Sequence, residues 1–299
     1  MNIKHFSLLA LVGPTGTGKT ALALEWARRD DAEIVNLDSR QVYRGLDIGS
    51  AKPTAAEQAL VPHHLFDVVA PDEPFDCVRY RELALRAIEE IRGRGKRVLL
   101  VGGTGLYLKV LRHGIFAGPA RDDALRARLQ AQEQAEPGSL HRRLREVDPD
   151  GAGRIHPNDI LRQVRALEVF ALTGRPLSEW QQEHGFREAS LDIRVVGLEL
   201  ERATLYERLD RRCAAMIGGG LVEEVRGLLA RGYRRELPAL RTIGYREIGA
   251  YLAGECALDA ARSAMMRATR QLAKRQMTWF RAVPDIQWMR VASAPDSAI

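Results

Sequence analysis

The start of the sequence constrains the fold most, because an apolar run is followed at once by a glycine-rich loop. Leu8–Val12 precedes the residues GPTGTGKT, and the helix-forming stretch Ala21–Glu25 follows them. Glycines at both ends of such a loop let backbone N–H groups turn inward on an anion, and the positive end of the next helix adds to the attraction. The order of strand, loop and helix therefore predicts a P-loop that binds a diphosphate or a triphosphate.

Two side chains of this loop have expected tasks. Lys19 is expected to reach the terminal phosphate as a point charge, and the Thr20 hydroxyl to hold a Mg²⁺ that bridges phosphate oxygens. The alternative is an ordinary glycine-rich turn, but the flanking strand and helix are those that the motif requires. The predicted diphosphate- or nucleotide-binding residues are Gly13, Pro14, Thr15, Gly16, Thr17, Gly18, Lys19 and Thr20.

Length and composition set limits on the class of protein. The chain has 299 residues, of which 45% are hydrophobic, enough to bury the core of one large domain or two ordinary ones. Its three cysteines form no C-x-x-C pair, so their spacing indicates neither a disulfide framework nor a zinc site. No apolar run approaches the ~18 residues of a membrane span, and no secretion signal is recognisable. We expect a cytoplasmic protein without a membrane partner, for which a monomer suffices.

Strand-like and helix-like stretches alternate along much of the chain. Strands are expected at 33–37, 97–101 and 194–200, and a helix at 78–91. This alternation predicts an α/β fold, a P-loop NTPase-like parallel sheet flanked by helices on both faces. Ligands bind at the carboxyl ends of the strands in such sheets, so Asp38, just after the second strand, should face the same crevice as Lys19.

The composition changes between residues 118 and 187, where Arg, Gln, Glu and Ala dominate and no convincing strand occurs. We interpret this stretch as an inserted all-helical domain. The predicted organisation is a core in two parts, 1–117 and 188–290, with the insert at 118–187 and a disordered tail at 291–299. Arg162 and Arg165 lie on one polar helix face of the insert, which is either solvated surface or a binding surface.

Two other segments carry expectations that depend on side-chain pattern. The loop from Gly45 to Pro53 has few apolar anchors, so a mobile segment that covers a ligand is expected there. The helix expected at about 258–282 should bury one apolar stripe, formed by Met265, Ala268, Leu272 and Trp279. A second stripe of this helix is basic and consists of Arg267, Arg270, Lys274 and Arg281. No acidic residue lies between Arg262 and Arg281, so this basic stripe predicts a face that follows nucleic-acid phosphates.

The acidic residues favour group transfer over nucleotide hydrolysis. P-loop NTPases bind their metal with an Asp that closes an apolar strand. Here the strand at 97–101 ends in Gly102–Gly103–Thr104–Gly105, and the strand at 194–200 carries only Glu199. Asp38 instead precedes a polar stretch suited to an acceptor, and we predict that it acts as a base. A small-molecule P-loop kinase and a nucleic-acid-binding NTPase without transferase activity remain open.

Several motifs, in order over residues 5–288, resemble the tRNA dimethylallyltransferase family, also called tRNA isopentenyltransferases. Besides the P-loop, they are the segments 38–53, 101–107, 165–169, 244–246 and 269–276. The resemblance implies transfer of a dimethylallyl group from dimethylallyl diphosphate to N6 of adenine 37, in tRNAs that read codons beginning with U. The bacterial form is the closer comparison, because no C-terminal Cys/His zinc module is present. Gly16–Thr17 replaces the Ala-Ser common in the family.

The resemblance also implies roles for single residues. Asp38 is implied to take a proton from the adenine amine, and Lys19, Arg208 and a Mg²⁺ at Thr20 to stabilise the departing diphosphate. Thr104 is implied to position the acceptor or the diphosphate. Contacts with the tRNA anticodon stem-loop are implied for Asp38, Ser39, Arg40, Gln41, Thr104, Arg126, Arg162, Gln163, Val164, Arg165, Ala166, Arg241, Thr242, Ile243, Gly244, Tyr245, Arg246, Thr269, Arg270, Gln271, Lys274, Arg275 and Gln276. The nearest alternative is an adenylate isopentenyltransferase, which acts on free AMP or ATP and does not need the insert or the basic stripe.

Overall fold

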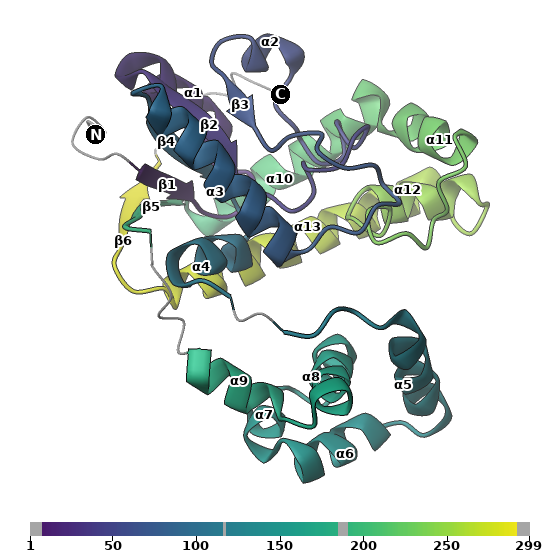
Figure 1. Ribbon diagram of the computed structural model, residues 1–299. Coiled ribbons are helices and arrows are strands. Elements are labelled where there is room, and N and C mark those ends of the chain that lie inside the picture. Colours follow the sequence, from purple (N-terminus) through teal and green to yellow (C-terminus); the bar gives the residue numbers. More distant parts are fainter. Residues whose placement is uncertain (1–7, 116–117, 185–190, 292–299) are drawn as a thin grey trace. The chain divides into compact units, whose positions relative to one another are not determined.

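The computed structural model describes residues 8–115, 118–184 and 191–291 (Figure 1). The chain divides into two compact units, one formed by Met1–Arg112 with Leu191–Ile299 and the other by His113–Ser190. Among the described residues, no helix combines the length and the apolar character that crossing a membrane requires.

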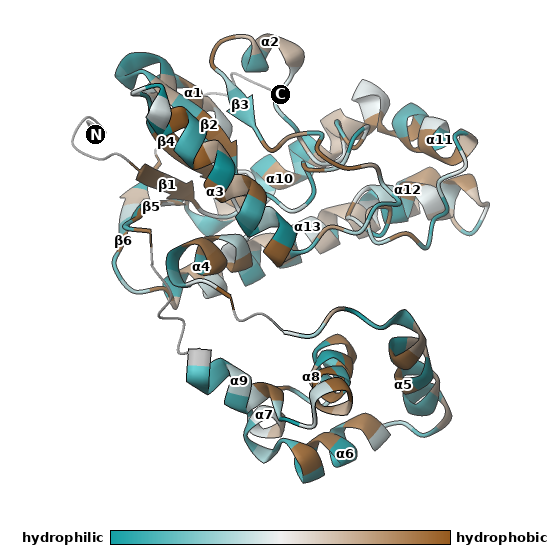
Figure 2. Ribbon diagram, viewed as in Figure 1, coloured by the Kyte–Doolittle hydropathy of each residue, from teal (hydrophilic) through white to brown (hydrophobic). Residues whose placement is uncertain are grey.

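A six-stranded parallel sheet forms the first unit, with the strand order β3-β2-β4-β1-β5-β6 (Figure 1). Its strands are β1 (Leu8–Val12), β2 (Ala32–Asn36), β3 (His63–His64), β4 (Arg97–Gly102), β5 (Arg194–Glu199) and β6 (Ile286–Arg290). β1 lies between β4 and β5 and is buried along its whole length, which explains its uniformly apolar sequence (Figure 2). Because the strands are parallel, their carboxyl ends share one edge of the sheet.

Helices flank this sheet and are held to it by apolar and aromatic contacts. On one face, Leu9, Leu11 and Leu99 pack with Trp26 of α1 (Lys19–Asp30). α3 (Cys77–Gly93) contacts β2 and β4, and α4 (Gly105–His113) follows β4. Tyr80 of α3 stacks on Tyr107 of α4 with ring centroids 3.7 Å apart. The fold thus places a helix after each of the central strands β1 and β4.

Four more helices build a second core beside the sheet. They are α10 (Arg202–Met216), α11 (Val222–Ala230), α12 (Tyr245–Leu252) and α13 (Leu258–Arg281). A π-helical turn, Ile217–Leu221, joins α10 to α11, and within it Gly220 has a φ of 106°, which favours glycine. The glycine run at 218–220 therefore ends α10 by a sharp bend rather than by a long loop.

The loop after β2 is anchored in this second core. Val42 and Leu46 are fully buried there with Tyr43, and Lys52 donates to the Tyr43 carbonyl at 3.0 Å while it pairs with Asp47 and Asp67. The expectation that Gly45–Pro53 has few anchors is therefore wrong, and its movement over a ligand stays a prediction. The segment is anchored by the apolar residues Val42, just before it, and Leu46, at its start, and by the buried side chain of Lys52 near its end.

Two strands were missing from the sequence-based prediction. β3 has two residues, too few for a pattern of alternation, and β6 follows a long helix at the edge of the sheet. β6 is specified by its partner, because Ile286 lies opposite Val195 of β5. Of the tail predicted to be disordered, 291–299, only Val291 belongs to the described residues, and its N–H donates to the Glu199 carbonyl at 2.9 Å.

The described part of the second unit is helical. Its helices are α5 (Asp123–Ala135), α6 (Ser139–Val147), α7 (Pro149–Arg154), α8 (Ile160–Thr173) and α9 (Leu177–His184), whereas the short α2 (Ala55–Gln58) belongs to the first unit. Aspartates 122, 148 and 159 accept backbone N–H bonds at the starts of α5, α7 and α8, which explains where these helices begin. Leu129, Leu140 and Leu167 lie in a core of the unit's own.

Candidate active site

The P-loop follows β1 in a backbone shape that its glycines permit. Gly13 has a φ of 141°, and a Cβ there would lie 2.6 Å from the Leu198 carbonyl oxygen. The buried Thr17 hydroxyl donates to the Pro14 carbonyl at 2.9 Å and so stabilises the loop from within. α1 begins after Gly18 without a side-chain cap, which leaves its first N–H groups for an anion.

Lys19 is held inside the loop. Its Nζ donates to the carbonyl oxygens of Gly13 at 2.9 Å and Pro14 at 2.8 Å, so one of its three protons remains for a ligand. Burial lowers the pKa of Lys19 to about 8, the Asp38 carboxylate opposes that shift, and Arg212 adds to it. Lys19 and Asp38 are therefore within electrostatic reach of each other, as the sequence predicted.

Asp38 is fixed by the residue at the end of β2. Asn36 is fully buried, and its amide nitrogen donates to the Asp38 carbonyl at 3.1 Å while its amide oxygen accepts the Asp38 N–H at 2.8 Å. Tyr80 supports Asn36 by donating to its carbonyl at 2.9 Å. One carboxylate oxygen of Asp38 accepts the Arg40 N–H at 2.7 Å, and the other has no hydrogen-bond partner among the described residues. Sequence reasoning overlooked Asn36, whose signal is a polar residue that directly follows the apolar pair Ile34–Val35 at the end of the strand.

Thr104 lies beside this segment. Its hydroxyl accepts the Ser39 N–H at 3.0 Å, and its own N–H donates to the Leu37 carbonyl at 3.1 Å. Gly102 allows this approach, because a Cβ at that position would lie 2.2 Å from the Leu37 carbonyl group. The structure thus brings the predicted residues of the P-loop, Asp38 and Thr104 to one edge of the sheet.

α10 directs two arginines at the P-loop, one predicted and one not. Arg208 donates to the Gly16 carbonyl at 3.4 Å, and Nη1 of Arg212 lies 3.5 Å from the Thr15 hydroxyl. Burial lowers the pKa of Arg212, and no carboxylate among the described residues forms an ion pair with it. A desolvated cation without a carboxylate partner is typical of an anion site. The spacing of four residues from Arg208, on one helix face, is the signal that could have identified it.

The basic stripe of α13 is less free than expected. Arg270 pairs with Asp210 of α10 at 3.0 Å, and Arg281 lies 3.9 Å from Glu199 of β5. The prediction of an unneutralised stripe is therefore wrong for Arg270 and Arg281, because their neutralising acids come from other elements. Arg267 and Lys274 have no ion pair among the described residues. The exposed cations of this helix are Arg262, Arg267, Lys274, Arg275 and Arg281, and Gln271 is exposed with them.

The buried face of α13 is also shifted from the expected stripe. Only Met265 of that stripe is fully buried, whereas Ala268, Leu272 and Trp279 are half-buried. The other fully buried residues of the helix are Ala261, Ala273 and Phe280. The Thr269 hydroxyl donates its hydrogen bond to the Met265 carbonyl at 2.8 Å, so it has no second proton to donate to RNA.

Two residues implied to contact tRNA have their amides engaged within the protein. Gln276 accepts the Thr15 N–H and donates to the Gly103 carbonyl, and Gln41 donates to the carbonyls of Ser50 and Ala51. Sequence similarity does not separate a residue that contacts RNA from one that holds the RNA-facing loops. Both glutamines therefore have an internal role in the structure, and their contact with tRNA stays a prediction.

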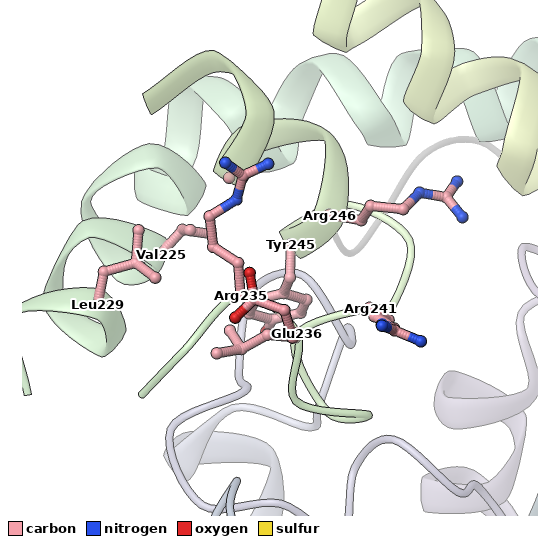
Figure 3. Close-up of a pocket in the computed structure, with 9 residues that line it drawn as sticks. Val225, Leu229, Arg235, Glu236, Arg241, Tyr245 and Arg246 are labelled. Atoms are coloured by element: carbon pink, nitrogen blue, oxygen red, sulfur yellow. The ribbon is translucent and has the colours of Figure 1, made fainter. Parts of the chain in front are cut away.

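The segment 241–246 is also divided between core and surface. Tyr245 is 1% exposed and donates its hydroxyl to Glu224 at 2.5 Å, and Thr242 and Gly244 are buried with it. Ile243 is half-buried, whereas Arg241 and Arg246 are exposed. Residues of α11, α12 and the segment between them line a hollow of about 250 Å³. In Figure 3, Arg241 and Arg246 both extend to one side of the Tyr245 ring.

In the second unit, two of the implied tRNA contacts share one buried carboxylate. Arg126 forms two hydrogen bonds to Glu168 at 2.7 Å each, and Arg165 forms one at 2.6 Å. Burial opposes ionisation, but these arginines and the Asp122 N–H bring the pKa of Glu168 down to about 2.

The other implied contacts of this unit differ in exposure. Gln163, Val164 and Ala166 are at most 2% exposed, so their side chains face the core and not RNA, which corrects the prediction for them. Arg162 is exposed, and its Nε lies 3.3 Å from Asp159. On a helix, residues three or four apart share a face, whereas residues adjacent in sequence point in different directions. Gln163, Val164 and Ala166 are therefore buried although Arg162 and Arg165 reach the surface.

No group of three or more His, Cys, Asp or Glu side chains that could hold a metal occurs in the described ranges. Thr20 lies in the first turn of α1, and its hydroxyl has no hydrogen-bond partner within the part of the chain that is described. A single hydroxyl at a phosphate loop suits Mg²⁺, which keeps several waters and binds mainly through substrate phosphates.

Known proteins with similar sequences belong to the family that the motifs of this site resemble. The sequence model of the IPP transferase family matches residues 41–283. A protein from Geobacter metallireducens called tRNA dimethylallyltransferase is 53% identical over 98% of this chain and 95% of its own length. A second one, from Geobacter sulfurreducens, is 50% identical over 97% of this chain and 94% of its own.

Solved structures agree as well. The full-length tRNA isopentenylpyrophosphate transferase from Bacillus halodurans is 39% identical, with a TM-score of 0.68 over 95% of this chain and 89% of its own. A eukaryotic dimethylallyltransferase acting on tRNA is 29% identical, with a TM-score of 0.76 over 95% of this chain and 73% of its own. The family match and the near-complete coverage at about half identity lead to one conclusion: this chain belongs to the IPP transferase family.

Proposed function

We propose that this protein transfers a dimethylallyl group from dimethylallyl diphosphate to N6 of adenosine 37 in tRNAs that read codons beginning with U, with release of diphosphate. The observation that supports the proposal is that the P-loop, with Lys19, and Asp38 lie at one edge of the sheet, where the Asp38 carboxylate acts electrostatically on Lys19. Lys19 belongs to a loop suited to a diphosphate, and we assign Asp38 to the acceptor. The family membership and the names of the relatives support the same reaction.

The acceptor amine needs a base. The lone pair of an exocyclic adenine amine is delocalised into the ring, so N6 is a poor nucleophile until it loses a proton. As the bond from N6 to C1 of the dimethylallyl group forms, the C1–O bond to diphosphate breaks and the N6 proton passes to Asp38. The carboxylate oxygen of Asp38 that accepts no protein hydrogen bond is suited to that proton, and Asn36 holds the backbone that carries it.

The leaving diphosphate needs positive charge. Positive charge gathers at the P-loop, from its own N–H groups and from Lys19, Arg208 and Arg212. These groups stabilise the negative charge that develops on the departing oxygen. Mg²⁺ would be held by the Thr20 hydroxyl and by diphosphate oxygens, and it supplies further neutralisation of that charge when bound. Glu199, the acidic residue at the end of β5, is engaged with Arg290 at 3.0 Å, which argues against a kinase-like metal site there.

The tRNA surface is proposed from the exposed members of the implied set. In the first unit these are Arg40, Arg241, Arg246, Gln271, Lys274 and Arg275. In the second unit, which we propose to be a tRNA-binding insert, Arg162 is exposed and Arg126 and Arg165 keep about a quarter to a third of their side chains exposed, 26% and 31%. Phosphate contacts of this kind offset the few kcal/mol that extrusion of the adenine costs.

The function is tested by incubating the protein with labelled dimethylallyl diphosphate, unmodified tRNA and Mg²⁺. Label in tRNA at position 37 is the expected result. Label in AMP instead would identify an adenylate isopentenyltransferase, and turnover of ATP without prenyl transfer would identify a kinase or an NTPase.

Arg212 is expected to contribute to diphosphate binding. In Arg212→Met, loss of a desolvated cation aimed at the loop should raise the Kd for dimethylallyl diphosphate about 10-fold or more. Calorimetric titration measures this, with Arg211→Met as the matched control, because Arg211 is the exposed neighbour on the same helix. Equal affinities in both variants would remove Arg212 from the diphosphate site.

Lys274 and Arg275 are expected to contact tRNA phosphates. In the double variant Lys274→Ala with Arg275→Ala, tRNA binding should weaken, and the slope of log K against log salt should become less steep by about 1.5. Binding titrations from 50 to 200 mM salt measure the slope. Arg270→Ala is the comparison, since its ion pair with Asp210 predicts a smaller change in slope. A double variant with the wild-type slope would place tRNA elsewhere.

A further inference from the structure

One side chain bonds to both loops of the candidate active site. The Gln276 amide oxygen accepts the Thr15 N–H at 2.9 Å, and the amide nitrogen donates to the Gly103 carbonyl at 3.0 Å. Thr15 belongs to the P-loop, and Gly103 directly precedes Thr104 of the acceptor side. The diphosphate loop and the acceptor loop therefore meet at a single amide.

Only a group with a donor and an acceptor at one end can make both bonds. Thr15 offers an N–H and needs an oxygen partner, whereas Gly103 offers a carbonyl and needs an N–H partner. An amide carries both, and these two partners fix which of its atoms faces which loop. A carboxylate lacks the donor, and a thioether of the same length replaces neither bond.

α13 sits directly on the acceptor loop. A Cβ at Gly103 would lie 2.3 Å from the Gln276 amide nitrogen, and a Cβ at Gly105 would lie 2.2 Å from the Trp279 ring. Both positions must stay small for the helix to approach this closely. Gln276 and Trp279 are three residues apart and so lie on one helix face. The loop is thus shaped to receive this face of α13.

We propose that Gln276 is a positioning residue that sets the spacing between the diphosphate loop and the acceptor loop. The proposal rests on the proposed function, and it assigns Gln276 a task different from tRNA contact. Lys274 and Arg275, which are exposed, directly precede it on the same helical turn. A tRNA phosphate bound by Lys274 and Arg275 would thus be linked, through the hydrogen bond of Gln276 to Thr15, to the backbone that receives the diphosphate.

Gln276→Met tests the clamp with little change in volume. With both substrates saturating, the single-turnover rate of transfer is expected to fall about 10- to 100-fold, because the reacting groups lose their relative position. The Kd for tRNA and the far-ultraviolet circular dichroism spectrum should stay at wild-type values. Gln287→Met is the matched control, an exposed glutamine of β6 outside the proposed tRNA surface, and should react at the wild-type rate. Weaker tRNA binding with an unchanged rate at saturation would instead show that Gln276 contacts RNA.

Gln276→Glu gives a readout that a purely structural role would not produce. An ionised carboxylate faces the Gly103 carbonyl without a donor, whereas a protonated one has an acceptor and a donor like the amide. Its pKa should be raised by that carbonyl and by partial burial. The ratio of the variant rate to the wild-type rate is therefore expected to rise as the pH falls from 8 to about 5.5. A ratio that does not change with pH would overturn the proposed hydrogen-bonding role.

A binding experiment separates this proposal from the proposed function. Titration with inorganic diphosphate and Mg²⁺ requires no transfer, and Gln276→Met is expected to weaken that binding about 3- to 10-fold, since the Thr15 N–H loses its partner. A wild-type protein that transfers nothing to tRNA would refute the proposed function alone. Wild-type diphosphate affinity in Gln276→Met would refute the clamp alone.

Discussion

In Asp38→Asn, the single-turnover rate of dimethylallyl transfer to tRNA falls about 10²- to 10⁴-fold, the usual contribution of a general base. The asparagine keeps an oxygen that accepts the Arg40 N–H, so the turn at the end of β2 should persist. It cannot take the proton that N6 must lose. Rapid-quench measurement with saturating substrates isolates this step from binding and product release.

Binding measurements complete the Asp38 experiment. The Kd values for tRNA and dimethylallyl diphosphate should stay within a few-fold of wild type, because neither substrate depends on the carboxylate for most of its contacts. Asp72→Asn, an exposed aspartate outside the site, serves as the control for loss of one negative charge. A rate close to wild type in Asp38→Asn would assign the proton to another group and remove the central element of the mechanism.

The parts of the site that sequence could predict are those defined by local order along the chain. The P-loop is a strand, a loop and a helix in succession, and Asp38 follows a strand whose carboxyl end has a known place in parallel sheets. Lys19 and Thr20 belong to this one segment, so their place could be predicted without knowing how the rest of the chain folds. The alternation of elements likewise predicted the sheet and its central strands.

The parts that sequence missed depend on contacts between distant segments. Arg212 and Gln276 reach the P-loop from 197 and 261 residues away. The only local signal for Arg212 is its four-residue spacing from Arg208, and the resemblance assigned Gln276 to tRNA contact rather than to the P-loop. The basic stripe of α13 was overestimated for the same reason, because Asp210 is on another helix. Residue type indicates which chemistry is possible, whereas pairing across the fold decides which groups remain free for substrate.

Lys19 is the second residue on which the reaction should depend strongly. In Lys19→Met, the transfer rate is expected to fall about 10²- to 10³-fold, the cost of removing one group that stabilises developing charge. The loop should keep its shape, because Thr17 bonds to Pro14 independently of the lysine. Binding of inorganic diphosphate should weaken in parallel, which calorimetry measures.

The pH dependence of diphosphate binding identifies Lys19 as the group responsible. Its pKa of about 8 means that the free protein loses the lysine charge as the pH rises through 8, while the ligand of choice, dimethylallyl diphosphate, is an ester that is already fully ionised there. An anion binds the charged form, so the Kd should rise roughly 20-fold from pH 7.5 to 9.5. Lys19→Arg, whose guanidinium stays charged throughout, should remove this rise even if its affinity differs. A wild-type Kd that is constant above pH 8 would mean that the lysine keeps its charge in the free protein, and that burial in the P-loop does not tune it.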